Sequence, residues 1–236
     1  MEHIRTAMQK ARASQGPAWF ADPVSAVSRA ARDLAWAALP PGRTDPAQFA
    51  QSRIVTAGSS DPARAAFDIM RTRVLHEMRR NGWSTVAVTS PTPGGGKSVV
   101  ALNLAFSLAN RADCHTALVD LDLRCPRVAT ALGLRNPPAI GAYLKGQASI
   151  EEAFLRYGHN LAVAPNGRPV HLPAELLQAP ETAKVFRELK QRLMPDVVIC
   201  DLPPMLANDD MMAFLPNVDC VILVVEAEAN SLDEVD

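Results

Sequence analysis

Residues 84–109 read STVAVTSPTPGGGKSVVALNLAFSLA, and they are the most informative part of the sequence. Its first part, Thr85 to Thr89, is a short run rich in Thr and Val, which predicts a buried strand. Two prolines and three glycines then break the chain and predict a turn with an unusually exposed backbone. From Val99 onward apolar residues occupy nearly every face, as expected of a helix buried against a sheet.

The turn and the residues after it have the order of a P-loop: strand, glycine turn, Lys97, Ser98 and helix. Glycines suit this chemistry because backbone N–H groups must come within hydrogen-bonding distance of phosphate oxygens, where any Cβ would clash. Lysine adds a point charge for the outer phosphates, and the serine hydroxyl ligates magnesium. We expect Lys97 at the sheet edge, with its charge in solvent or on a phosphate. The usual pattern has a glycine where this chain has Pro91, so the motif alone leaves open an ordinary glycine-rich loop.

Two carboxylates follow in the next apolar run, TALVDLDL at residues 116–123, which predicts a buried strand with Asp120 and Asp122 at its carboxyl end. Side chains two positions apart on a strand face the same side. Burying both is costly without cations, because like charges side by side raise each other's pKa. Magnesium and a nearby lysine would offset that cost. The alternative is a solvated strand end.

A third carboxylate, Asp201, ends the apolar run DVVICDL at residues 196–202, and two prolines stop the strand there. This is the Walker B arrangement, in which the aspartate holds a magnesium-bound water. A weak strand at residues 161–164 and an apolar strand at residues 219–225 complete the pattern. Strands alternating with helices predict an α/β fold with a doubly wound, mostly parallel sheet and right-handed crossovers. Ligands of such sheets lie at the carboxyl ends of the strands, where these aspartates fall.

The composition bounds the class of protein: 236 residues, 48% hydrophobic and 21% charged, fit one soluble domain with a short extension. The net charge of -1 and the lack of a long basic run argue against nucleic-acid binding. The longest apolar runs fall short of the roughly 20 residues that a membrane helix needs. The N-terminus lacks the pattern of a secretory signal, so the sequence predicts a cytoplasmic protein with reduced cysteines.

Residues 1–60 differ from the rest because they are rich in alanine, arginine and proline. They predict two modest helices, around residues 4–11 and 24–34, and then a linker. We interpret this helical extension either as a docking segment for a partner or a membrane surface, or as a weakly ordered extension. Residues 61–236 form the predicted P-loop domain, which opens with a helix.

Five short motifs occur in the order of a known family: PGGGKS at 93–98, NLA at 103–105, VDLDLR at 119–124, ELL at 175–177 and DLPPML at 201–206. On these motifs the chain resembles the bacterial tyrosine kinases of exopolysaccharide and capsule synthesis, relatives of the MinD and ParA ATPases. The combination is specific, because the second aspartate motif separates these kinases from most P-loop proteins. The resemblance runs from about Phe67 to the end of the sequence.

The resemblance implies a P-loop NTPase fold of the MinD/ParA type that binds ATP and Mg²⁺. It implies that Lys97 contacts the phosphates and that Asp201 holds the metal through water. Asp120 would contact the acceptor hydroxyl or the metal, and Asp122 would support the site. The implied nucleotide-binding residues are Pro93, Gly94, Gly95, Gly96, Lys97, Ser98, Val99 and Arg124. The implied metal-binding residues are Ser98, Asp120 and Asp201, and Asp210 falls where the family has another aspartate.

The sequence departs from the family in three places. A helix before the P-loop normally carries an ExxRxxR motif that joins subunits into a ring, and here the matching residues are Ala65, Asp68 and Arg71. The family's C-terminal tyrosine cluster has no counterpart, since the only tyrosines are Tyr143 and Tyr157. The family's domain also continues past the last predicted strand, so we expect a domain that is cut short at its C-terminus or closes differently. These departures predict weak or partner-dependent self-association.

The expected function is that of an ATP-dependent protein tyrosine kinase or kinase-like ATPase that regulates exopolysaccharide or capsule synthesis and export. The resemblance implies two partners, a transmembrane polysaccharide co-polymerase or activator and a protein that supplies the acceptor tyrosine. Such an activator would bring the chain to the inner face of the plasma membrane. One alternative is a nucleotide-gated interaction module without kinase activity. The other is a partition or positioning ATPase, although that class usually has a further lysine where Pro91 and Thr92 stand.

Overall fold

The computed structural model describes residues 26–58 and 61–227, so the helix expected around residues 4–11 lies outside the described residues. The chain divides into two compact units, residues 1–34 and 35–236. Of the first unit, the structure describes only the first part of helix α2 (Ala26–Ala38). The second unit carries the sheet and the helices that cover it.

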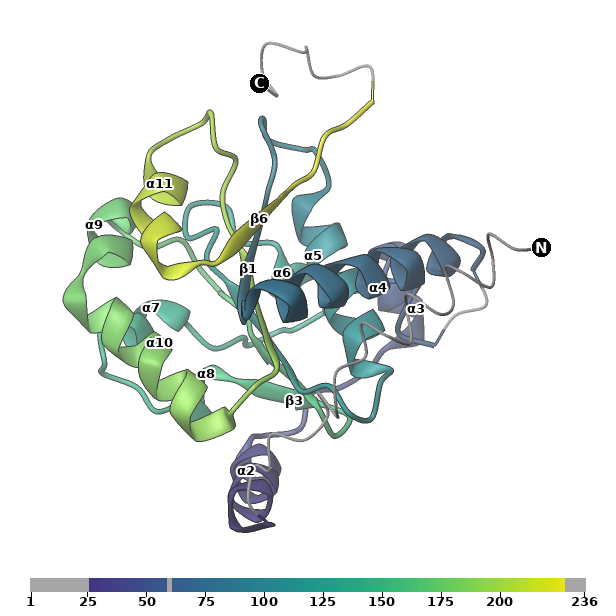
Figure 1. Cartoon of the computed structure of the whole chain (residues 1–236). Coiled ribbons are helices and arrows are strands. Elements are labelled where there is room, and N and C mark those ends of the chain that lie inside the picture. Colours follow the sequence, from purple (N-terminus) through teal and green to yellow (C-terminus); the bar gives the residue numbers. More distant parts are fainter. Residues whose placement is uncertain (1–25, 59–60, 228–236) are drawn as a thin grey trace. The chain divides into compact units, whose positions relative to one another are not determined.

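The second unit is built on a six-stranded sheet with the strand order β3-β4-β2-β5-β1-β6 (Figure 1). Neighbouring strands are parallel, except that β3 and β4 are antiparallel. The predicted α/β fold with a doubly wound, mostly parallel sheet is therefore confirmed. The strands are β1 (Thr85–Thr89), β2 (Thr116–Asp120), β3 (Leu155–Tyr157), β4 (Leu161–Ala164), β5 (Val197–Asp201) and β6 (Cys220–Leu223).

The central strands are apolar along their length because both faces of the sheet are covered. Every residue of β1, β2 and β5 is buried. The parallel register places Asp120 opposite Asp201 on neighbouring strands. Val88 of β1 also pairs with Asp201, so the glycine loop after β1 starts at the same edge. The register thus brings the two aspartate motifs and the glycine loop together.

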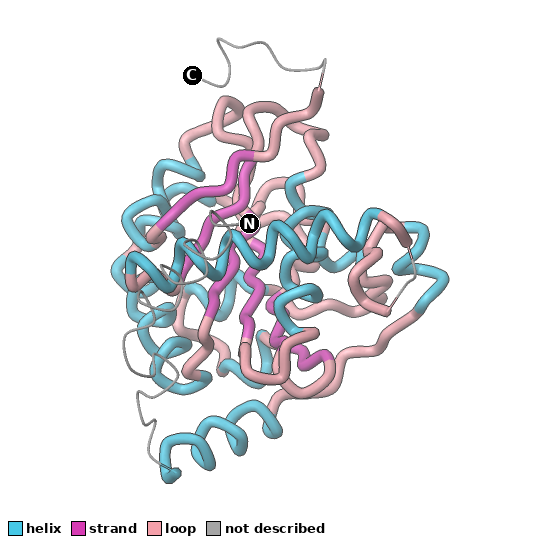
Figure 2. The backbone as a smooth tube through the Cα atoms, turned by 45° about the vertical axis from the view of Figure 1, so that its right-hand side comes forward, coloured by secondary structure: helices cyan, strands magenta, loops and turns pink. Residues whose placement is uncertain are grey.

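Two sets of helices pack on the two faces of the sheet (Figures 1 and 2). On one face α4 (Ala63–Asn81) and α5 (Lys97–Ala109) cover side chains such as Val86 and Val88. On the other face the core includes residues of α10 (Pro180–Leu193) and the shorter helices near it. Among the described residues, no helix has the length and hydrophobicity that a membrane span requires. The short helices are α3 (Pro46–Gln51), α6 (Val128–Ala131), α7 (Ile140–Leu144), α8 (Ile150–Ala153), α9 (Pro173–Gln178), α11 (Asp210–Phe214) and the 3-10 helix η1 (Leu215–Asn217).

Residues 35–58 belong to the compact unit, whereas the sequence predicts a linker over most of them. Trp36 is buried, and its indole N–H donates to the Leu193 carbonyl at 2.7 Å. Phe49 and Ile54 are buried in the same apolar cluster as helix α5. The compact unit therefore begins at Ala35, because this segment buries large apolar side chains that a linker would leave in water.

One buried amide fixes this segment to the helix that follows the glycine loop. The Asn103 side-chain oxygen accepts from the backbone N–H of Val55 at 2.8 Å and of Thr56 at 3.2 Å. Its NH₂ group donates to the carbonyls of Arg53 and Val99, at 2.8 and 2.9 Å. Because a buried amide is stable only when its donors and acceptors are paired, Asn103 locks the chain before α4 onto α5.

Candidate active site

The glycine loop between β1 and α5 has a backbone that other residues could adopt only with strain. Gly94 and Gly96 have φ angles of +94° and +81°, in the left-handed region that favours glycine. A Cβ on Gly95 would lie 3.1 Å from the Ser90 Cβ and 3.5 Å from the Val224 carbonyl oxygen. Gly96 caps α5, and no side chain bonds the N–H groups at the start of that helix. These N–H groups and the positive end of the helix dipole are arranged to receive an anion.

Lys97 is the first residue of α5 and lies in a cluster of acidic groups. Its ammonium nitrogen is 2.7 Å from Asp122 Oδ2 and 3.4 Å from Asp201 Oδ1. The sequence predicts this charge in solvent or on a phosphate, but the residue is only 7% exposed and its charge is paired with the two carboxylates. Burial alone would lower the pKa of Lys97, but Asp201 and Asp122 outweigh it and raise this pKa.

The carboxylates of the cluster outnumber the cations. Asp120 and Asp201 are fully buried. Burial and then the neighbouring Asp201 raise the pKa of Asp120 well above its usual range. Burial likewise raises the pKa of Asp201, against the opposing effect of Lys97. Three carboxylates therefore share one ammonium group, and a further cation would relieve their mutual repulsion.

The two aspartates after β2 have different surroundings. Asp120 accepts from the backbone N–H groups of Asp122 at 3.3 Å and of Val128 at 3.2 Å. Asp122 lines the pocket, contacts Lys97 and accepts from the N–H of Cys125 at 3.0 Å. The sequence predicts Asp120 as the carboxylate nearest the reacting groups and Asp122 as its support. The structure instead brings Asp122 to the pocket wall and places Asp120 beneath it.

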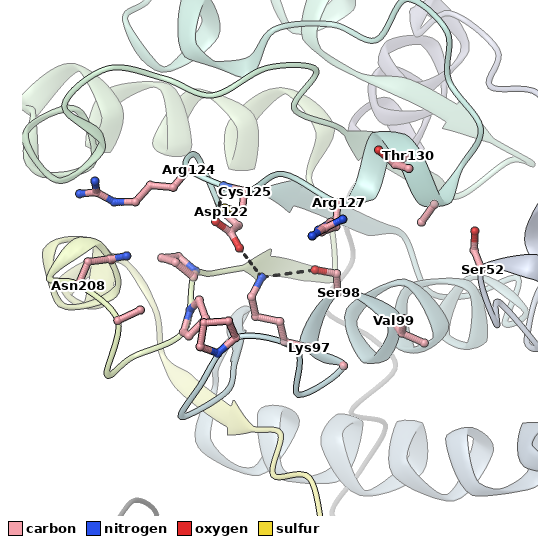
Figure 3. A pocket seen from close by; sticks show the side chains of 17 residues that line it. Ser52, Lys97, Ser98, Val99, Asp122, Arg124, Cys125, Arg127, Thr130 and Asn208 are labelled. Atoms are coloured by element: carbon pink, nitrogen blue, oxygen red, sulfur yellow. Dashed lines mark hydrogen bonds and ion pairs between the residues drawn. The ribbon is translucent and has the colours of Figure 1, made fainter. Parts of the chain in front are cut away.

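A cavity of about 510 Å³ opens above this cluster (Figure 3). Of the residues predicted to bind the nucleotide, those that line this cavity are Pro93, Gly94, Gly96, Lys97, Ser98, Val99 and Arg124. Sequence reasoning missed several lining residues, which are Ser52, Cys125, Arg127, Thr130, Ala131, Ala207 and Asn208. Ser52 reaches the pocket only through the packing of the segment before α4. Cys125 and Arg127 directly follow the VDLDLR motif, and this proximity is the signal that could have found them.

Arg124 lines the pocket, but its guanidinium is already paired. It forms two bonds with the Asp210 carboxylate, at 2.7 and 2.9 Å. Asp210 is fully buried, at the start of α11. Figure 3 shows the Arg124 side chain pointing away from Lys97 and Ser98. The structure thus pairs two residues that the sequence singles out separately. The charge of Arg124 is neutralised by Asp210 and is not free for a ligand in the pocket.

The oxygen atoms at the base of the pocket suit Mg²⁺. Asp201 Oδ2 is buried and has no hydrogen-bond partner among the described residues. The Ser98 hydroxyl is 3.4 Å from the Lys97 nitrogen, which in turn contacts Asp201. No group of three His, Cys, Asp or Glu side chains converges on a metal position in the described part of the chain. Mg²⁺ does not need such a cage, because it is usually bound by one or two protein oxygens, water and phosphate. Ser98 and Asp201 fit that donor set. Each Asp120 oxygen accepts a backbone N–H, and Asp120 does not line the pocket.

Comparison with known proteins agrees with this geometry. A family model described as ParA, "NUBPL iron-transfer P-loop NTPase", matches residues 83–235. EpsB of Ralstonia solanacearum is 31% identical over 176 residues, which cover 74% of this chain and 23% of that protein. The tyrosine-protein kinase YwqD of Bacillus subtilis is 35% identical over 146 residues, 61% of this chain and 60% of that one. The solved kinase domain of the Escherichia coli tyrosine kinase ETK is 26% identical with a TM-score of 0.70, over 77% of this chain and 71% of that domain.

This chain spans about a quarter of EpsB and somewhat under two thirds of YwqD. The match covers the sheet, the glycine loop and the aspartate motifs, which are the parts that build the pocket. The solved ETK domain has the same fold over most of its length. The chain belongs to the ParA-like family of P-loop NTPases, and its relatives in that family include bacterial tyrosine-protein kinases.

Proposed function

We propose that this chain is an ATP-dependent protein tyrosine kinase domain whose P-loop pocket binds Mg·ATP. The observation that carries the proposal is the buried cluster of Lys97, Asp122 and Asp201 beneath the pocket. Phosphoryl transfer needs little covalent chemistry from the protein, because positioned phosphates, a metal and a carboxylate beside the incoming hydroxyl are sufficient. The proposal extends to the whole chain what the names of its relatives say of those proteins.

Each group in the cluster has a distinct task in this proposal. The N–H groups of the glycine loop hold the phosphates, and Lys97 turns its charge from the aspartates toward them. Ser98 and Asp201 would hold Mg²⁺, which when bound neutralises charge on the phosphates. Asp122 Oδ2 takes the proton from the phenolic hydroxyl of the acceptor as that oxygen attacks. Asp120 fixes the loop that carries Asp122 through its bonds to two backbone N–H groups.

The acceptor tyrosine lies outside the 236 residues of this sequence, because both of its tyrosines are buried. Tyr143 is 4% and Tyr157 3% exposed. The Tyr143 hydroxyl donates to the Val185 carbonyl at 3.2 Å, and the Tyr157 ring packs edge-on against Phe106. Burial raises the pKa of Tyr157 to about 12 and that of Tyr143 further still. Neither hydroxyl can reach an active site without local unfolding.

A phosphotransfer assay tests the proposal. The purified chain is incubated with Mg·ATP and a random copolymer of glutamate and tyrosine, and phosphotyrosine is detected on each component. We expect phosphotyrosine on the copolymer and none at Tyr143 or Tyr157. The double variant Tyr143→Phe/Tyr157→Phe serves as a matched control and should modify the copolymer as well as the unaltered chain. Phosphotyrosine mapped to either buried tyrosine would contradict this assignment of the acceptor.

A second candidate function is a nucleotide-gated interaction module that phosphorylates nothing. The burial of both tyrosines favours it, since neither tyrosine of these 236 residues is an accessible acceptor. Such a module would bind Mg·ATP with the same residues but lack phosphotransfer. Nucleotide binding without phosphotyrosine on the copolymer or on any co-expressed membrane partner would favour this function over the kinase.

The proposed setting is exopolysaccharide or capsule synthesis, at the inner face of the plasma membrane. The support is the family resemblance of the motifs, which implies a transmembrane co-polymerase or activator as partner. The cytoplasmic segment of that partner would complete the nucleotide site and raise turnover by fixing charges in place before reaction. Equal phosphotransfer rates with membranes that contain the co-polymerase and membranes that lack it would contradict this setting.

Self-association should be weak, because the charged side chains on the face of α4 that carries Arg71 are already paired within the chain. Arg71 donates to Asp68 Oδ1 at 2.8 Å and to the Ser107 carbonyl at 3.0 Å. The Ser107 hydroxyl donates to the same Asp68 oxygen at 2.8 Å. Arg71 therefore has little charge left for a neighbouring subunit. We expect a monomer or weak dimer by light scattering at micromolar concentration, and a ring-sized particle without nucleotide or partner would refute this.

A further inference from the structure

Three cations line the P-loop pocket, and two of them are neutralised. Lys97 contacts Asp122 and Asp201, and Arg124 is paired with Asp210. The third is Arg127, which is exposed and whose side chain forms no ion pair or hydrogen bond within residues 26–58 and 61–227. In Figure 3 its guanidinium faces the side of the pocket that holds Ser98 and Lys97. Within the described part of the chain, Arg127 is thus an unpaired positive charge in a pocket whose other two cations are paired with aspartates.

The backbone holds Arg127 in this position. Two carboxylates of the site fix the loop on either side of it, because Asp122 accepts from the Cys125 N–H and Asp120 from the Val128 N–H. Pro126 lies between these two contacts and restricts the backbone immediately before Arg127. Arg127 is also the residue from which α6 starts. Its attachment point is therefore as well fixed as the catalytic aspartates, and only its side chain is free to adjust.

The charges of the site indicate what Arg127 can bind. The ammonium of Lys97 is shared between carboxylates, so an entering triphosphate meets only part of its positive charge. A guanidinium presents a planar fork of donors that matches two oxygens of one phosphate group. The loop of Arg127 also carries Asp122, the carboxylate proposed to face the acceptor. Arg127 therefore belongs to the end of the pocket where phosphoryl transfer takes place.

We propose that Arg127 binds the terminal phosphate of ATP and makes the pocket prefer ATP to ADP. This inference rests on the proposed function, because it requires nucleotide in the P-loop pocket. The glycine loop and the start of α5 serve the inner phosphates, which ATP and ADP share. Arg127 serves the phosphate that only ATP has. Its side chain would draw in on binding and supply the charge that Lys97 divides among the aspartates.

Titration calorimetry with the full chain tests this proposal, with Mg·ATPγS and Mg·ADP as probes. Arg127→Gln should weaken ATPγS binding roughly ten- to a hundredfold and ADP binding by less than about threefold. Arg127→Lys keeps the charge but loses the planar fork of donors, so its ATPγS affinity should fall between that of the unaltered chain and that of Arg127→Gln. The matched control is Arg187→Gln, which removes an exposed arginine of α10 outside the pocket and should leave both affinities unchanged.

The outcomes separate this inference from the proposed function. If the unaltered chain binds neither nucleotide, the P-loop assignment and this inference fail together. If the unaltered chain binds both nucleotides and Arg127→Gln binds ATPγS equally well, only the inference about Arg127 is overturned. Equal losses for ATPγS and ADP would also overturn it, because they would place Arg127 at a shared phosphate. Urea unfolding of the nucleotide-free variants should match that of the unaltered chain, since the Arg127 side chain is exposed and forms no ion pair or hydrogen bond within the described residues.

Discussion

Replacing Lys97 by methionine is expected to lower phosphotransfer and ATP turnover at least about a thousandfold. The ammonium group is the only cation on the first turn of α5, and no other residue of the pocket can deliver a charge to the phosphates from the same position. Its loss removes stabilisation at the moment when charge develops on the transferred group. Initial rates with saturating Mg·ATP and the tyrosine copolymer measure the effect.

The same substitution should also weaken the fold, since Lys97 is buried between Asp122 and Asp201. Removing one partner of a buried ion pair costs roughly 3–5 kcal/mol, because the remaining charge is left uncompensated. Lys184→Met is the matched control. Lys184 is an exposed lysine of α10, 3.8 Å from Glu188, and its loss should change neither turnover nor urea unfolding. A Lys97→Met variant with near-normal turnover would refute the P-loop assignment.

Asp201→Asn is expected to stabilise the nucleotide-free chain at neutral pH while it removes turnover. Burial raises the pKa of Asp201, so the folded state disfavours the ionised carboxylate. For a carboxyl group whose folded pKa lies above its unfolded value, stability is full below the unfolded pKa and is lost as pH rises through the folded pKa. Asparagine cannot ionise and avoids that loss. The stability gain of the variant should therefore be absent near pH 4 and grow as pH rises.

Two measurements test the two halves of this prediction. Urea unfolding between pH 4 and pH 8 should show the midpoint of the unaltered chain falling below that of Asp201→Asn as pH increases. Turnover should fall at least about a hundredfold, because asparagine cannot replace the buried carboxylate oxygen that would hold Mg²⁺. Glu188→Gln, on the exposed face of α10, is the control and should change neither quantity. Equal stability of Asp201→Asn and the unaltered chain throughout this range would contradict the claim that ionising the buried Asp201 carboxyl destabilises the fold.

Most of the sheet could be predicted from the sequence because its central strands are continuous apolar runs between turn residues. The edge strand β3 could not, since its three residues, Leu155 to Tyr157, are too few to show a period. The segment before α4 was also missed. Its buried side chains, such as Trp36 and Phe49, are far apart in sequence and show no helical spacing. What holds the segment is the side chain of Asn103, on a helix some fifty residues away.

The site was predictable where a motif carries the chemistry and not where packing decides. Lys97, Ser98 and Asp201 could be named because P-loop chemistry needs those groups at those positions. The pairing of Lys97 with Asp122 could not, because it depends on which side chains meet once the strand ends are aligned. For the same reason the sequence could not predict which of Asp120 and Asp122 lies deeper below the pocket. Strand alternation predicts that both face one side, but β2 ends at Asp120, and the loop that follows places Asp122 at the pocket wall.

Cys125 offers the most direct test of the central claim that this pocket is the nucleotide site. It is the only exposed thiol in the described part of the chain, and it lines the pocket. Burial raises the pKa of Cys114 to about 11, so this thiol should not compete for a reagent at neutral pH, and burial also raises the pKa of the partly buried Cys220. The pKa of the fully buried Cys200 is raised as well.

The measurement is the rate at which N-ethylmaleimide labels Cys125 at pH 7, followed by mass spectrometry of the peptide that contains it. Mg·ATP at about a hundred times its Kd should slow this labelling roughly tenfold or more, because the occupied pocket excludes the reagent. The Lys97→Met variant at the same nucleotide concentration should label at the rate of the nucleotide-free chain. A labelling rate at Cys125 that saturating Mg·ATP leaves unchanged in the unaltered protein would contradict the assignment of this pocket to the nucleotide.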